Sequence, residues 1–135
     1  MTVLEALVGR LKGHAAVAAE LGDRIYADWI DRRNPYWPAA TVQLDSDEPD
    51  YHAGGVDGVR RASLTVTAWA RTRAEATAAG DAIEARLSGS RGSWLGLAVL
   101  GCFTQSRDVQ SEEATNHDLE FAGREITAEV IYRPN

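Results

Sequence analysis

The sequence predicts an α+β fold with a single mixed or antiparallel sheet of about four strands and helices packed on one face. Two observations indicate this fold. Apolar residues recur at helical spacing near the N-terminus and again in mid-chain, and four other segments alternate apolar and polar residues as half-buried strands do. The order helix, helix, strand, strand, helix, strand, strand fits two strand pairs around one helix better than a parallel crossover. Residues 1–135 are expected to form one domain, because neither a linker nor an internal repeat divides them.

Two helices are expected at the N-terminus. Thr2 and Glu5 have the spacing of a capping box, and Gly13 is expected to end the first helix. A second, alanine-rich helix over residues 14–21 is expected to end at Gly22. The apolar stripe of the first helix consists of Val3, Leu4, Leu7, Val8 and Leu11.

The first strand pair is expected after an irregular stretch that begins at residue 23 and contains Pro35 and Pro38. A strand is expected over residues 40–45, and a polar loop with Pro49 over residues 46–58. The clearest strand is expected over residues 59–70. The two strands are expected to bury Ala40, Val42 and Leu44, and Leu64, Val66 and Ala68, respectively.

A third helix is expected behind a second capping box, Thr72 to Glu75, with Ala79, Ile83 and Leu87 on its apolar stripe. After a turn at residues 89–92, strands are expected over residues 97–103 and 121–133. The loop between them is acidic. The last strand is expected to bury Ile126, Ala128, Val130 and Tyr132, and the acidic loop contains Glu112, Glu113, Asp118 and Glu120.

Composition excludes several classes of protein. The chain has 135 residues, of which 44% are hydrophobic and 25% charged, as in ordinary globular domains. No apolar run approaches the roughly 18 residues that span a bilayer, and no secretory signal is visible, so no membrane partner is expected. The net charge of −6 opposes a nucleic-acid-binding module, which needs a basic face.

Candidate chemistry is sparse. The single cysteine, Cys102, excludes an internal disulfide and is expected to be a buried hydrophobe rather than a catalytic thiol. A metal site could join His52, His117 and a loop carboxylate, and Asp47, Glu48 and Asp50 could bind calcium. We expect solvated loop residues instead, because no metal-binding or catalytic motif frames them. No metal, no cofactor and no enzymatic activity are therefore expected.

Aromatic and arginine residues suggest a contact surface. They concentrate between residues 26 and 37, and Arg60-Arg61 precedes a strand. Tyr, Trp and Arg dominate protein interfaces, although these aromatics could equally pack under their own loop and the arginines could be a solvated lead-in. The candidates for a subunit or partner interface are Tyr26, Trp29, Arg32, Arg33, Tyr36, Trp37, Arg60 and Arg61.

Three segments carry a resemblance to a known family. They are residues 22–26 (GDRIY) after the alanine-rich helix, residues 38–42 (PAATV), and residues 61–70 (RASLTVTAWA) followed by Ala74-Glu75-Ala76. In this combination the chain resembles the tail-completion, or tail-terminator, proteins of long-tailed (siphovirus-like) phages, prophages and gene transfer agents. The resemblance covers nearly the whole chain. It departs from the family at Tyr36-Trp37 and in a long 106–120 loop, which leaves partner contacts open.

The resemblance implies a structural protein without a cofactor. Family members form a ring, commonly a hexamer, at the head-proximal end of the tail tube, where they stop polymerisation and meet the head connector. The implied partners are further copies of the chain, the tail tube protein and the head–tail connector or stopper protein. The implied location is the head–tail junction of a phage-like particle, with assembly in the host cytoplasm.

A ring on a tail tube must let DNA pass without binding it, and an acidic lining would repel phosphate. The lumen candidates are Asp45, Asp47, Glu48, Asp50, Glu112 and Glu113. Three alternatives stay open: a head-completion or stopper protein on the connector side, a small α+β ligand-binding domain or enzyme, and a nucleic-acid-binding module.

Overall fold

The computed structural model describes residues 2–27, 37–52, 55–110 and 122–133, with the side chains of 50–52, 55–57 and 110 left undescribed. Its described residues form one six-stranded sheet in the order β1-β2-β3-β6-β5-β4. The helices are α1 (Val3–Lys12), α2 (Ala15–Leu21) and α3 (Arg73–Leu87). The strands are β1 (Ile25–Ala27), β2 (Ala39–His52), β3 (Gly55–Ala70), β4 (Gly92–Trp94), β5 (Leu97–Gln110) and β6 (Ala122–Arg133).

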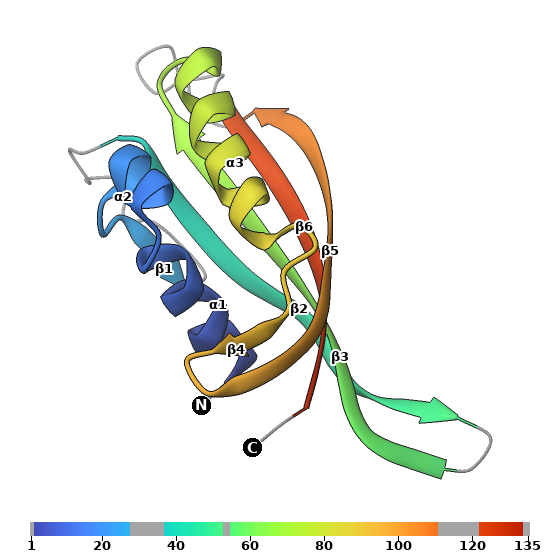
Figure 1. Cartoon of the computed structure of the whole chain (residues 1–135). Coiled ribbons are helices and arrows are strands. Elements are labelled where there is room, and N and C mark those ends of the chain that lie inside the picture. Colours follow the sequence, from blue (N-terminus) through green and yellow to red (C-terminus); the bar gives the residue numbers. More distant parts are fainter. Residues whose placement is uncertain (1, 28–36, 53–54, 111–121, 134–135) are drawn as a thin grey trace.

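The three helices cover one face of the sheet, as expected from the sequence (Figure 1). Helix α3 packs mainly on β6 and β3, while α1 contacts β2 and β4. The hydrophobic core lies between these layers and combines residues from all three helices with the inward-facing residues of the strands. Its largest fully buried side chains include Trp94, Leu7, Leu11, Leu21, Leu64, Ile83 and Leu87.

The predicted helices are confirmed, and their ends follow local chemistry. Thr2 and Glu5 form the reciprocal capping box, and Gly13 follows the last turn of α1. Gly22 ends α2 with a φ of 56°, in the region where a side chain would be strained. At α3, the Thr72 side chain accepts from the Glu75 N–H, and the predicted stripe is buried.

The sheet has two more strands than predicted. Residues 25–27, expected to be irregular, form β1, and residues 92–94 form β4. Each has three residues, too few to show the alternation that predicts a strand. Strand β1 pairs with β2 in parallel, whereas every other pair is antiparallel, so the sheet is mixed.

The predicted loop at residues 46–58 is wrong, because β2 continues to His52 and β3 starts at Gly55. We call residues 46–58 the hairpin arm; Figure 1 shows its outer end projecting beyond the rest of the molecule. Pro49 is compatible with this ladder because β2 has no described neighbour on its outer side there. The pairing is irregular between Leu44 and Ser46 and again between Pro49 and Tyr51.

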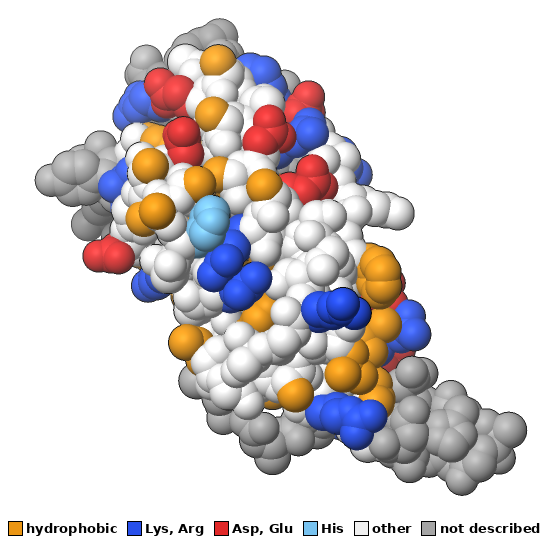
Figure 2. All heavy atoms as spheres, viewed as in Figure 1, with side chains coloured by type: hydrophobic (Ala, Val, Ile, Leu, Met, Phe, Trp, Pro, Cys, Tyr) orange, Lys and Arg blue, Asp and Glu red, His pale blue; other side chains and the backbone are white. Residues whose placement is uncertain are grey.

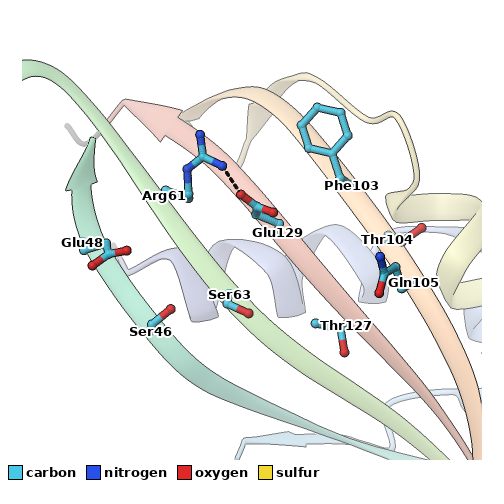
Figure 3. Close-up of a pocket in the computed structure, with 9 residues that line it drawn as sticks. All are labelled: Ser46, Glu48, Arg61, Ser63, Phe103, Thr104, Gln105, Thr127 and Glu129. Atoms are coloured by element: carbon cyan, nitrogen blue, oxygen red, sulfur yellow. Dashed lines mark hydrogen bonds and ion pairs between the residues drawn. The ribbon is translucent and has the colours of Figure 1, made fainter. Parts of the chain in front are cut away.

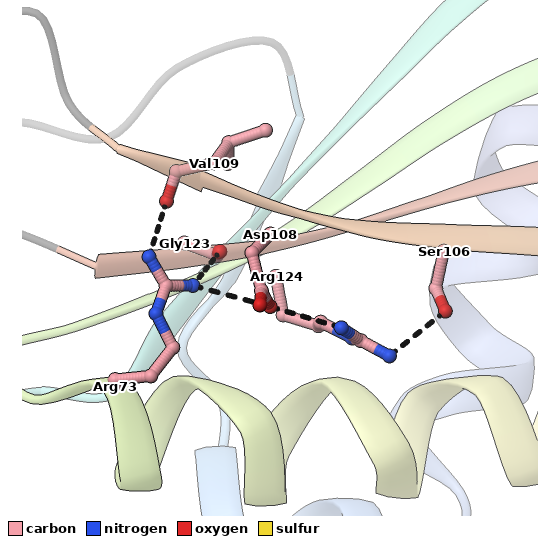
Figure 4. Close-up of polar contacts among 6 residues, drawn as sticks. All are labelled: Arg73, Ser106, Asp108, Val109, Gly123 and Arg124. Carbon is pink, nitrogen blue, oxygen red and sulfur yellow. Dashed lines mark hydrogen bonds and ion pairs between the residues drawn. The ribbon is translucent and has the colours of Figure 1, made fainter.

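Strand β5 also exceeds its prediction, which ended at residue 103, so part of the predicted 106–120 loop is strand. A polar network ties its end to α3 (Figure 4). Arg73 donates to the carbonyls of Gly123 (2.6 Å) and Val109 (2.9 Å), and Asp108 pairs with both Arg73 (3.3 Å) and Arg124 (2.9 Å). Gly80 of α3 makes room for Arg124, since a Cβ there would lie 2.2 Å from Arg124 Cγ.

Candidate functional site: the uncovered face of the sheet and the base of the arm

The sheet face opposite the helices is polar. Alternate residues of each strand enter the core, so their neighbours point to the other side. In β3 and β6, the buried Leu64, Val66, Ile126 and Ala128 therefore put the residues between them on the other face. We call this side the uncovered face. It carries Ser63 and Thr65 of β3 and Glu125, Thr127 and Glu129 of β6.

A shallow groove of about 370 Å³ crosses the uncovered face (Figure 3). Arg61 of β3 donates to Glu129 of β6 at its edge, and Arg107 pairs with Glu125 nearby at 3.0 Å. These pairs neutralise part of the charge on a surface otherwise rich in hydroxyl groups. The groove is lined by Ser46, Glu48, Arg61, Ser63, Phe103, Thr104, Gln105, Thr127 and Glu129.

On the helical side, a three-residue cluster fixes the base of the hairpin arm. Asp47 of β2 accepts hydrogen bonds from the Tyr132 hydroxyl (2.7 and 2.8 Å) and from Arg60 Nε (3.1 Å). Burial and the Asp47 carboxylate raise the pKa of Tyr132 to about 12. The hydrogen bond to Asp47 raises the pKa of Arg60. The cluster joins β2, β3 and the end of β6 where the arm leaves the sheet.

Replacing Tyr132 with phenylalanine is expected to lower the free energy of unfolding by about 1 kcal/mol near neutral pH, the usual net value of one hydrogen bond. Because the folded-state pKa of Tyr132 lies above its ordinary value of 10.0, this contribution is complete below pH 10.0 and is lost as the pH rises toward about 12. Urea denaturation of both proteins across this pH range measures it. A stability difference that persists unchanged at pH 12 would contradict this account.

The structure separates the candidate interface residues. Tyr26 lies half-buried in β1 and Trp37 is partly buried before β2. Arg60 and Arg61 point to opposite faces, where they bind Asp47 and Glu129, respectively. Trp29, Arg32, Arg33 and Tyr36 lie outside the described residues. The interface role of the whole set stays a prediction.

The acidic lumen candidates are also divided. Asp45 and Glu48 are exposed; Glu48 points to the uncovered face, and Asp45 accepts a hydrogen bond from Thr65 there. Asp47 points to the helical side instead. The Asp50 side chain is undescribed, as is that of His52, while Glu112, Glu113 and His117 lie outside the described residues.

Sequence reasoning missed two carboxylates of the uncovered face, Glu125 and Glu129. The signal was present in the sequence, because burying Ile126, Ala128 and Val130 forces the residues between them to the opposite side.

Cys102 is buried in β5, as predicted, and burial raises the pKa of its thiol to about 11. In the described part of the chain, no three His, Cys, Asp or Glu side chains gather as a metal site. No helix among the described residues is long and apolar enough to cross a membrane.

The described residues thus combine a helical layer on one side of the sheet, a polar open face on the other and a projecting two-stranded arm. The family model "Tail completion protein gp17" matches residues 5–122, and the chain belongs to this family. It is a structural component of phage-type tails and not an enzyme. The resemblance stated from the sequence is thereby confirmed.

Among solved structures, a similar chain comes from the "virion of native gene transfer agent (GTA) particle". The two chains superpose with a TM-score of 0.73 at 15% sequence identity, over 98% of this chain and 95% of that one. At this identity the likeness shows a shared fold. No curated protein matches the sequence.

Proposed function

We propose that the protein caps the head-proximal end of the tail tube, ends tube polymerisation and joins the tail to the head connector as a hexameric ring. The observation that carries the proposal is the family match across residues 5–122. The tube protein and the connector or stopper protein are its partners, and residues 1–135 act as one domain at the head–tail junction. The ring assembles in the host cytoplasm.

The shape of the chain is suited to a ring. A closed ring needs a heterologous interface, in which two different surfaces of each copy meet. The two edges of the described sheet differ, since β1 and β2 form one edge and β4 and β5 the other, and the hairpin arm extends from one end of the sheet only (Figure 1). Each copy therefore offers unlike surfaces to its two neighbours.

The uncovered face is the proposed lining of the lumen. Four carboxylates lie on it, and the arginines Arg61 and Arg107 offset part of their charge. The residual negative charge would repel DNA phosphates, while the serine and threonine hydroxyl groups between the carboxylates keep the surface hydrated. The carboxylates are Asp45, Glu48, Glu125 and Glu129.

Neutralising Glu125 and Glu129 together, as Glu125→Gln and Glu129→Gln on the central strand β6, is expected to leave particles assembled but to slow DNA ejection several-fold. The physical reason is weaker repulsion between the lining and the passing phosphates. Release of DNA from purified particles, followed by dye fluorescence, measures the rate. The matched control is Asp81→Asn, a substitution at an exposed position of helix α3. Unchanged ejection by the double variant would contradict the lumen role.

The proposed function is tested by electron microscopy of particles from a producing strain that lacks the gene. Overlong tubes detached from filled heads are expected. Normal-length tails on intact heads would refute the terminator role. Heads that have lost their DNA beside tails of normal length would favour a stopper on the connector side.

A further inference from the structure

At each edge of the sheet, a strand segment has no outer neighbour among the described residues. Strand β1 covers only Ala40–Val42 of β2, and β4 covers only Leu97–Val99 of β5. Beyond them, residues 43–52 of β2 and residues 101–110 of β5 have no outer neighbour in the described part of the sheet. Open backbone donors and acceptors on a long edge are a template for pairing with another chain.

The side chains on these edges favour association. Two of the four exposed large hydrophobic residues that the structure describes lie in the open segments, Leu44 on β2 and Phe103 on β5, and a third, Leu100, directly precedes the β5 segment. In Figure 2, hydrophobic side chains form a row along one side of the body, next to the base of the arm. Proline and lysine commonly guard an edge; the β5 segment contains neither, and the β2 segment contains one such residue, Pro49.

The charges of the two edges are complementary. Residues 43–50 of β2 carry four acidic side chains and no basic one; Asp47 is held by Arg60 and Tyr132, whereas Asp45 and Glu48 are exposed. On β5, the Arg107 side chain pairs with Glu125 and is still 71% exposed, whereas the neighbouring Asp108 is held by Arg73 and Arg124 on the helical side. A second copy of this chain therefore supplies a suitable partner for each edge.

We propose that residues 101–110 of one copy pair antiparallel with residues 43–52 of the next copy, so that the sheet continues from subunit to subunit. We call this strand pairing between copies the seam. This inference rests on the ring of the proposed function. The three antiparallel pairings from β2 through β3 and β6 to β5 make the two edges run in opposite directions. Rotation about an axis roughly along the strands preserves these directions, so each seam is antiparallel.

The short strands β1 and β4 set the offset of the seam. In a level arrangement, neighbouring copies would sit at the same height along the axis. Gln43 of one copy would then face Gln105 of the next, because within one copy both residues align with Thr65 and Thr127. Strand β1 of one copy would then lie against β5 of its neighbour, and β4 of that neighbour would lie against β2, so both short strands would block pairing. Sliding the copies until the open segments coincide removes both obstacles. A closed barrel also requires a stagger of this kind.

Because the two open segments have equal length, full overlap fixes the facing residues. Gln105 of one copy lies opposite Glu48 of the next, and both belong to the uncovered face. Arg107 lies opposite Ser46 and beside Asp45, which brings the exposed guanidinium to the acidic edge. Asp108 lies opposite Asp45, but its carboxylate is paired with Arg73 and Arg124 on the helical side. Directly opposed side chains have Cβ atoms about 4.5–5.5 Å apart.

The test uses two chains produced together in the strain that makes the particles, one carrying Glu48→Cys and the other, enlarged by a tag, carrying Gln105→Cys. A short bis-maleimide is added to the lysate. We expect a mixed cross-linked dimer, and its loss when either chain is produced alone. The matched control is Gln43→Cys with Gln105→Cys, which probes the level arrangement and should give no mixed dimer. Native Cys102 can remain because it is buried.

The outcomes separate the seam from the proposed function. Absence of the Glu48–Gln105 product, or a product from the Gln43–Gln105 pair instead, would overturn the seam. A Glu48–Gln105 product that does not sediment with tails would support the seam and refute the role at the tube end. A product that sediments with tails supports both.

Discussion

Replacing Trp94 with alanine is expected to lower the free energy of unfolding by about 3–5 kcal/mol, the usual cost of removing a large buried aromatic side chain. Trp94 is 1% exposed and lies in the core beneath α1. Its indole N–H donates to Ser90 Oγ (3.1 Å), and the guanidinium carbon of Arg10 lies 5.9 Å from the ring centroid. The substitution therefore removes a side chain that joins β4 to α1.

Urea denaturation of the purified protein measures this effect. Trp94→Phe is the matched variant, because it retains an aromatic ring but loses the indole N–H, and it should cost clearly less than alanine. A Trp94→Ala protein whose free energy of unfolding lies within about 1 kcal/mol of the parent value would show that β4 contributes little to the core. Only sites that are exposed, or whose surroundings can close the cavity, tolerate such a change.

Replacing Asp47 with alanine is the second large expected effect, a loss of about 2 kcal/mol. The carboxylate accepts from both Tyr132 and Arg60, so its removal leaves two donors without their acceptor. The Arg60 side chain is 33% exposed, so water can replace the lost acceptor there, which limits the stability lost at Arg60. Because a two-stranded ribbon is marginally stable by itself, the arm should also open more often.

Two measurements check the Asp47→Ala result. Urea denaturation gives the global stability. Amide hydrogen exchange, compared with the parent protein, should become faster in residues 46–60 by a larger factor than in the strands under α3. The neighbouring Glu48→Ala is the control, because Glu48 is exposed on the opposite face and should change stability by no more than about 0.5 kcal/mol. Equal effects of the two substitutions would show that the cluster does not hold the arm.

The layered architecture could be predicted because its elements carry strong local signals. The cap at Thr2, the glycine after α2 and the alternation in β3 and β6 each reflect local chemistry that acts within a few residues. The arm could not be predicted in this way. Its sequence shows no apolar alternation, and Pro49 with the nearby glycines is typical of a loop.

The candidate site was predicted only in part, for a related reason. Asp47 and Tyr132 are 85 residues apart in sequence, and only the pairing of three strands brings them together. The same pairing places Arg60 and Arg61, adjacent in sequence, on opposite faces with different acidic partners. The uncovered face, in contrast, follows from the residues between the buried positions of β6.

The burial of Cys102 has a consequence for the behaviour of the protein in an aerated solution. Oxidation to sulfenic acid and thiol–disulfide exchange both proceed through an accessible thiolate. The only sulfhydryl of the chain stays protonated up to a pKa of about 11 and is 1% exposed. The thiol of the folded protein is therefore protected against adventitious disulfide bonding and oxidation even where the medium is not reducing.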